Sequence, residues 1–168
     1  MSECLRIAKP GAPLVCFTDW RQLPSTTDTI QVGGWVWRGI AVWDKPTARP
    51  ALGRFMNSAE YMVWGSKGPM PQRDGIGNLP GTYRVSVRQA DKHHVTGKPT
   101  DLMRQVVRIC APGGLILDPF AGSGTTGVAS LLEGRQFIGI EQEHVYVDIA
   151  QRRLESIEST GSAESAVA

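Results

Sequence analysis

Short apolar runs that end in a polar or turn residue alternate with amphipathic segments along this chain. The β-branched and apolar runs predict strands at residues 13–17, 35–43, 60–64, 83–87, 115–117 and 136–140. Helical periodicity and start signals predict helices at residues 22–33, 100–111, 125–133 and 144–156, after a short helix ending at 5–7. The last third reads strand, glycine turn, helix, strand, helix, which is typical of a βαβ unit with parallel strands. The predicted fold class is therefore α/β, a mostly parallel sheet with a hairpin.

The length of 168 residues favours a single domain, expected over residues 1–158. Residues 65–92 are rich in Gly, Pro, Arg and Lys and are predicted to form a long surface insertion. Residues 159–168 are small and polar, so we expect a disordered tail there. Thr100 follows Pro99 and is the predicted N-cap of the helix that begins there.

Composition excludes several classes of protein. Hydrophobic residues make up 41% and charged residues 20%, a globular balance, and no apolar run is long enough to cross a membrane. The first ten residues lack the apolar core of a signal peptide. Three cysteines without a Cys-x-x-Cys spacing favour a reducing compartment and predict no metal site. The expected location is the cytoplasm.

The charge is distributed unevenly. Residues 45–108 hold eleven Lys or Arg against four Asp or Glu, whereas residues 109–168 hold three against eight. A middle third this basic indicates a polyanionic partner such as nucleic acid, although a solvated surface produces the same pattern.

A glycine-rich turn stands between the predicted strand at 115–117 and the helix that follows. Gly122, Gly124 and Gly127 satisfy G-x-G-x-x-G, and Glu141 lies 19 residues after Gly122 at the end of the next strand. Glycines let a ligand approach the backbone at a helix N-terminus, and a carboxylate there can accept hydrogen bonds from both ribose hydroxyls. The pattern predicts an adenosine cofactor. A nicotinamide oxidoreductase remains an alternative at this point.

The residues around the turn resemble a known family. Asp118-Pro119-Phe120-Ala121-Gly122-Ser123-Gly124-Thr125-Thr126 is similar to the cofactor motif of S-adenosylmethionine-dependent DNA amino-methyltransferases, which act on N6 of adenine or N4 of cytosine. The segment Gly97–Leu102 resembles the Lys-Pro-x-x-Leu segment that precedes this motif. Further matches are found at residues 5–11, 43–45 and 60–64. The order of the motifs, over about residues 3–157, is that of the permuted β subgroup.

The resemblance implies a Rossmann-like methyltransferase fold, S-adenosylmethionine as cofactor and double-stranded DNA as partner, in a phage or bacterial setting such as restriction–modification. The implied cofactor-binding residues are Asp118, Phe120, Gly122, Ser123, Gly124, Thr125, Glu141, Lys98 and Thr100. The residues implied to contact DNA are Arg49, Arg54, Arg73, Arg84 and Arg88. Residues 65–92 would form the target-recognition insertion, and no metal is implied.

The family's catalytic motif, Asp/Asn/Ser-Pro-Pro-aromatic, does not occur in this sequence. Its polar side chain and a proline carbonyl bind the target amine, and its aromatic ring stacks on the flipped base. In the permuted order this motif precedes the first residue, so the chain resembles a member truncated at its N-terminus, and no catalytic residue is assigned. A catalytically weak or inactive DNA-binding or regulatory member is the alternative function. Methylation at C5 of cytosine is excluded because no cysteine follows a proline.

The missing motif also affects the expected sheet. In the family, the strand that carries it lies between the strands matching Leu14–Phe17 and Leu115–Leu117, so each of these would lack one neighbour. Unpaired apolar edges tend to pair with another chain. We therefore expect a homodimer or strand exchange, and little methylation by the chain alone.

Overall fold

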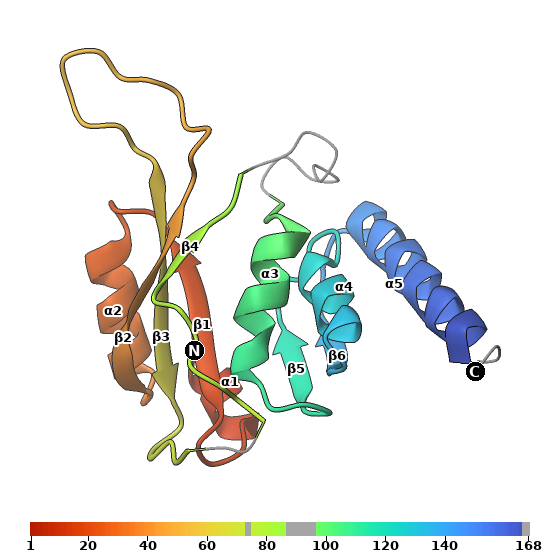
Figure 1. The fold of residues 1–168 in the computed structure, drawn as a ribbon. Coiled ribbons are helices and arrows are strands. Elements are labelled where there is room, and N and C mark those ends of the chain that lie inside the picture. The colour runs from red at the N-terminus through yellow and green to blue at the C-terminus, as the bar shows by residue number, and fades with distance from the viewer. Residues whose placement is uncertain (73–74, 87–96, 166–168) are drawn as a thin grey trace. The chain divides into compact units, whose positions relative to one another are not determined.

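A computed structural model describes residues 1–72, 75–86 and 97–165 of the chain (Figure 1). Contacts within the chain divide it into two compact units, Met1–Ser86 and Val87–Ala168, and each is described by itself. The expected single domain over residues 1–158 stays a prediction.

The first unit is a four-stranded sheet with two helices. Its elements are α1 (Ser2–Ile7), β1 (Pro13–Thr18), α2 (Leu23–Val32), β2 (Val36–Asp44), β3 (Ala59–Ser66) and β4 (Thr82–Arg84). The strand order is β1-β3-β2-β4; β3 is antiparallel to both of its neighbours, and β4 runs parallel to β2. The predicted hairpin is thus β2–β3.

The core of this unit lies between the sheet and its helices. Ile30 of α2, Trp35 and Val63 of β3 are buried together, and Leu5 and Cys16 pack against them. Burying such side chains removes apolar surface from water, the main source of stability in a domain of this size. Burial also raises the pKa of the Cys16 thiol, so this cysteine stays protonated and belongs to the core.

The second unit contains a βαβ segment. Its elements are α3 (Thr100–Val106), the 3₁₀ turn η2 (Val107–Ile109), β5 (Leu115–Asp118), α4 (Thr125–Leu132), β6 (Gln136–Gly139) and α5 (His144–Ser165). β5 and β6 pair in parallel from Leu115 opposite Gln136 to Asp118 opposite Gly139. Helix α4 contacts both strands and lies between α3 and α5 (Figure 1). The predicted strand–turn–helix–strand order is confirmed.

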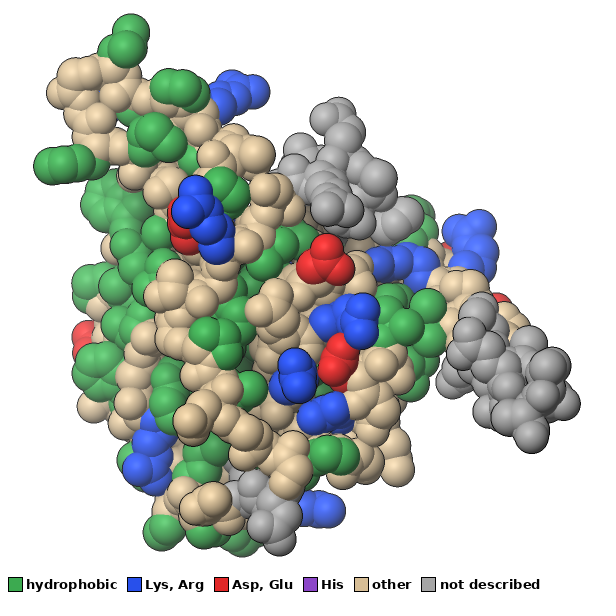
Figure 2. Space-filling view, viewed as in Figure 1, with side chains coloured by type: hydrophobic (Ala, Val, Ile, Leu, Met, Phe, Trp, Pro, Cys, Tyr) green, Lys and Arg blue, Asp and Glu red, His purple; other side chains and the backbone are tan. Residues whose placement is uncertain are grey.

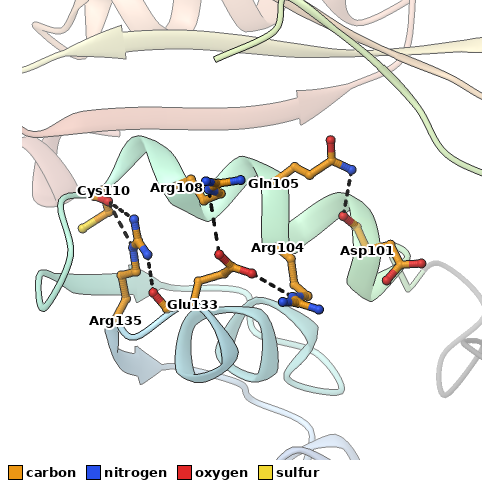
Figure 3. A network of polar contacts seen from close by, with 7 residues as sticks. All are labelled: Asp101, Arg104, Gln105, Arg108, Cys110, Glu133 and Arg135. Carbon is orange, nitrogen blue, oxygen red and sulfur yellow. Dashed lines mark hydrogen bonds and ion pairs between the residues drawn. The ribbon is translucent and has the colours of Figure 1, made fainter. Parts of the chain in front are cut away.

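A polar network joins the end of η2 to the end of α4 (Figure 3). The Arg135 guanidinium donates to the Cys110 carbonyl oxygen at 3.2 and 3.0 Å and to the Glu133 carbonyl oxygen. The Glu133 carboxylate accepts a hydrogen bond from Arg104 of α3 at 2.8 Å and lies 3.8 Å from the Arg108 guanidinium. These contacts hold α3 and η2 against α4 within the second unit.

Three details of the prediction need correction. The larger sheet is mixed rather than mostly parallel, because two of its pairings are antiparallel. Pro99, not Thr100, is the N-cap of α3, since the Leu102 and Met103 amides donate to its carbonyl oxygen. Helix α5 continues to Ser165 where a disordered tail was predicted from residue 159, and Ala163 and Glu164 are good helix formers.

Candidate functional site

The turn between β5 and α4 is held by the side chain of Asp118. Its Oδ1 accepts a hydrogen bond from the Phe120 amide at 3.0 Å, and its Oδ2 accepts one from the Thr126 hydroxyl at 2.6 Å. One carboxylate thus ties the end of the strand to the turn and to the first turn of the helix. Asp118 therefore shapes the site from within the protein.

Two glycines of the turn adopt left-handed backbone conformations, for different reasons. Gly122 has φ +52°, and a Cβ built there would meet nothing within 4 Å. Gly124 has φ +78°, and its Cβ would lie 2.8 Å from Cβ and 3.0 Å from Cα of Ala150 in α5. Gly122 thus faces open space in which a ligand can approach the backbone, whereas Gly124 lets α5 pack closely against the turn.

Glu141 joins the end of β6 to the glycine turn. Its Oε2 accepts a hydrogen bond from the Gly122 amide at 2.8 Å, and its Oε1 accepts from the Gln142 and Glu143 amides at 2.9 and 3.1 Å. Oε1 thus accepts two backbone hydrogen bonds and Oε2 accepts one, so the carboxylate is fixed beside the glycine turn. The acidic residue predicted from its spacing is brought directly to the predicted turn.

The side-chain hydroxyls of Ser123 and Thr125 lie close to the guanidinium group of Arg153. Both residues are buried, at 4% and 8% exposure. Nη1 of Arg153 in α5 donates to the Ser123 carbonyl oxygen at 2.5 Å and lies 3.3 and 3.2 Å from the two hydroxyls. The predicted ligand contacts of these side chains remain untested, and their observed role is to fix the turn. The sequence does not predict a role for Arg153, because this residue is distant from Ser123 and Thr125 along the chain and no motif connects them.

The other predicted cofactor residues belong to the same unit. Phe120 is 88% exposed, so its ring is free to pack against a flat heterocycle. Lys98 is half-buried just before the buried Pro99, and Thr100 is the first residue of α3. An exposed aromatic ring suits a flat heterocycle and an ammonium group suits a carboxylate, and contact of these residues with a cofactor remains a prediction.

The predicted DNA-binding arginines lie in the first unit or outside the described residues. Arg49 and Arg54 are exposed on the loop between β2 and β3. Arg84 of β4 is exposed and lies 3.5 Å from the Asp44 carboxylate. Arg73 and Arg88 fall outside the described residues, as do parts of the predicted insertion at 65–92.

The described part of the chain holds neither a cluster of metal ligands nor a membrane-spanning helix. Residues 1–72, 75–86 and 97–165 contain no group of three His, Cys, Asp or Glu side chains placed to hold a metal ion. No helix within those ranges has the length and apolar character needed to cross a membrane.

Comparisons with known proteins agree with the resemblance at the glycine turn. A family model described as DNA methylase, of the N6/N4 class, matches residues 1–152. Type II methyltransferase M.HinfI of Haemophilus influenzae is 29% identical over 94% of this chain and 50% of its own length. Type II methyltransferase M.Cfr9I of Citrobacter freundii is 34% identical over 75% of this chain and 47% of its own. The chain thus spans about half the length of these relatives.

Solved structures confirm the fold class. The crystal structure of the M1.HpyAVI–SAM complex matches with a TM-score of 0.77 and 27% identity, over 91% of this chain and 79% of that one. The cytosine-N4-specific PvuII DNA methyltransferase matches with a TM-score of 0.72 and 21% identity, over 90% and 69%, which concerns the fold alone. The α/β, Rossmann-like methyltransferase fold is therefore confirmed. Because the family model matches residues 1–152, most of the chain, the chain belongs to the N6/N4 DNA methylase family.

Proposed function

We propose that this chain holds the cofactor site of a DNA amino-methyltransferase, which transfers a methyl group from S-adenosylmethionine to N6 of adenine or N4 of cytosine. The observation that carries the proposal is the hydrogen bond between the Gly122 amide and Glu141 Oε2, 2.8 Å long, beside the open space at Gly122. It combines an accessible backbone with an acceptor for ribose hydroxyls, as an adenosine cofactor requires. The neighbour M1.HpyAVI is a SAM complex with the same fold.

Each predicted residue has a distinct role in this proposal. Glu141 accepts hydrogen bonds from the ribose hydroxyls, Phe120 packs against the adenine ring, and Lys98 and Thr100 lie toward the methionine end. Asp118, Ser123 and Thr125 hold the turn in shape through their own hydrogen bonds. The cofactor supplies an electrophilic methyl group, and the protein contributes mainly by positioning.

The proposed partner is double-stranded DNA, bound through the basic middle of the chain. Arg49 and Arg54 are exposed, and Arg84 is exposed next to Asp44. Such guanidinium groups bind phosphates and release condensed counterions, so we expect affinity for DNA to fall steeply as salt rises. Charge reversal at Arg49 and Arg54 together should weaken binding for every DNA sequence.

We also propose that the chain pairs with a second copy and functions in the cytoplasm. Among the described strands, β1 is hydrogen-bonded only to β3 and β5 only to β6, so each has an open edge. Open strand edges favour pairing with another chain. Three cysteines without disulfides suit a reducing compartment.

The test begins with cofactor binding measured by calorimetry. S-adenosylhomocysteine should bind and raise the melting temperature, whereas NAD should do neither; at 100 times Kd a ligand stabilises by about 2.7 kcal/mol. Glu141→Ala should weaken binding by about 1.5–3 kcal/mol for each hydrogen bond to the charged carboxylate. Unchanged affinity would remove Glu141 from the site, and stabilisation by NAD alone would favour an oxidoreductase.

A methylation assay on DNA then separates catalysis from binding. The sequence contains no Pro-Pro pair, so no segment of this chain matches the family's catalytic tetrapeptide. We expect DNA binding with slow methyl transfer, or none, by this chain alone. Turnover typical of a complete enzyme would show that other residues activate the target amine.

A further inference from the structure

The loop between β2 and β3, residues 45–58, presents large apolar side chains to solvent. Leu52 is 95% exposed and Phe55 is 97% exposed, with Met56 beside them at 44%. A single exposed apolar side chain is ordinary, but three exposed ones within residues 52–56 of one loop indicate a binding surface. The loop projects beyond the ends of its two strands (Figure 1), and hydrophobic side chains stand apart from one another at that end in Figure 2.

The tip of this loop is an ordered turn. The Arg54 amide donates to the Ala51 carbonyl oxygen at 3.4 Å, which places Leu52 and Gly53 at the two central positions. Gly53 has φ +69°, a conformation that glycine adopts without strain. Leu52 is thus presented at the bend of this turn, and Phe55 directly follows it.

The base of the loop is also fixed. The Lys45 amide donates to the Ser58 carbonyl oxygen at 2.7 Å, and the Lys45 ammonium pairs with Glu60 at 3.0 Å. Pro46 and Pro50 restrict the backbone between base and tip. A loop constrained at both ends loses little conformational freedom when its tip enters a binding site.

The charge of the loop favours a polyanion. Residues 45–58 contain no Asp or Glu, and Arg49 and Arg54 flank Leu52 in sequence. Neither arginine forms an ion pair with any residue that the structure describes, whereas Lys45 is already paired with Glu60. A protein partner would cover the apolar tip, but it would also need to supply carboxylates for both guanidinium groups.

We infer that this loop is a wedge that enters the base stack of double-stranded DNA. Leu52 and Phe55 insert between neighbouring base pairs, while Arg49 and Arg54 bind phosphates on either side. Apolar side chains such as Leu and Phe unstack base steps in this way and kink the duplex. Enzymes that act on an exocyclic amine must take the base out of the stack, and local unstacking lowers the cost of that step. The inference rests on the proposed function, since it names how the DNA to be methylated would be opened.

The experiment uses the full chain and a pool of mixed-sequence duplexes that contain 2-aminopurine, whose fluorescence rises when it leaves the stack. Binding is followed by anisotropy over a range of salt concentrations. The double variant Leu52→Ser/Phe55→Ser should bind about tenfold more weakly and lose the fluorescence rise, with an unchanged dependence on salt. Arg49→Gln/Arg54→Gln should instead reduce the slope of log K against log salt by about two. Val32→Ser is the matched control, because Val32 is 88% exposed at the end of α2, outside the loop.

The possible results separate the wedge from the proposed function. If the wild-type chain binds no duplex at low salt, both the DNA assignment and the wedge fail. If it binds with a steep salt dependence but raises no fluorescence, or if Leu52→Ser/Phe55→Ser behaves like Val32→Ser, only the wedge is overturned. A double variant that changes the sedimentation of the protein while leaving the fluorescence rise intact would overturn the wedge in favour of a contact between copies.

Discussion

At the scale of single residues, the two left-handed glycines of the turn serve different purposes, although the motif treats them alike. Gly122 leaves open space for a ligand, whereas Gly124 is required because a Cβ at this position would lie only 2.8 Å from Cβ of Ala150. The spacing of Asp118 and Glu141 is readable from the sequence, because a βαβ unit brings the ends of successive strands to one edge. The sequence motif does not distinguish a glycine that leaves room for a ligand from a glycine that leaves room for a packed helix.

The two glycines should therefore respond differently to alanine. Each substitution places a Cβ at positive φ, which costs about 1–2 kcal/mol. Gly124→Ala must also displace the backbone of α5, so we expect a clearly larger loss of unfolding free energy in urea than for Gly122→Ala. Gly122→Ala should instead lower affinity for S-adenosylhomocysteine at modest cost in stability. Equal destabilisation by the two variants would contradict the role given to Ala150.

Arg153 is the residue whose contribution the sequence conceals. Its contacts with Ser123 and Thr125 join α5 to the turn, and its neighbour Arg152 only donates to the Asp148 carbonyl of its own helix, at 3.1 Å. Arg153→Met should leave the buried Ser123 carbonyl and the hydroxyls without this donor, at a cost of about 1–3 kcal/mol. We expect urea unfolding and cofactor affinity to change together in Arg153→Met and to stay near wild type in Arg152→Met. Similar behaviour of the two variants would show that the turn does not depend on this contact.

At the scale of elements, the order of helices and strands can be predicted from the sequence, whereas the pairing of distant strands cannot. The order β5, α4, β6 follows from apolar runs and glycine punctuation, which are local signals. The pairing of β4 does not, since three residues, Thr82–Arg84, align with β2 through contacts distant in sequence. The extension of α5 was missed because small polar residues resemble a disordered tail, although Ala and Glu also sustain a helix.

The contact between α3, η2 and α4 gives a prediction at this scale. Arg135 is buried and donates two hydrogen bonds to the Cys110 carbonyl that ends η2, whereas Arg104 forms a partly exposed ion pair with Glu133. Arg135→Met should lower the unfolding free energy by about 1–3 kcal/mol. Arg104→Met should lower it by about 0–1 kcal/mol, because exposed pairs are weak. Urea denaturation of both variants measures the difference. A larger loss of unfolding free energy in Arg104→Met than in Arg135→Met would show that the ion pair between Arg104 and the Glu133 carboxylate is the more stabilising contact.

At the scale of the whole molecule, the strands of the two units leave edges unsatisfied. Among the described strands, β1 has β3 as its only partner and β5 has β6 as its only partner. Both are short apolar strands of the kind that sheets normally cover on each side. The local sequence predicts that these strands exist. It does not predict which strand pairs with their second edges, because that depends on assembly. The predicted homodimer therefore needs its own experiment.

Sedimentation velocity over a range of concentrations provides that experiment. We expect the wild-type chain to shift from monomer toward dimer as concentration rises, because pairing between copies satisfies open edges. Leu115 of β5 is 54% exposed, and a charge on an edge strand opposes pairing, so Leu115→Lys should move the equilibrium toward monomer. Leu132→Lys places the same charge at a 43% exposed position at the end of α4, which is not on a strand, and should sediment like wild type. A wild-type chain that stays monomeric at every concentration would contradict the dimer, while a dimer weakened equally by both variants would move the contact from the β5 edge to a general apolar surface.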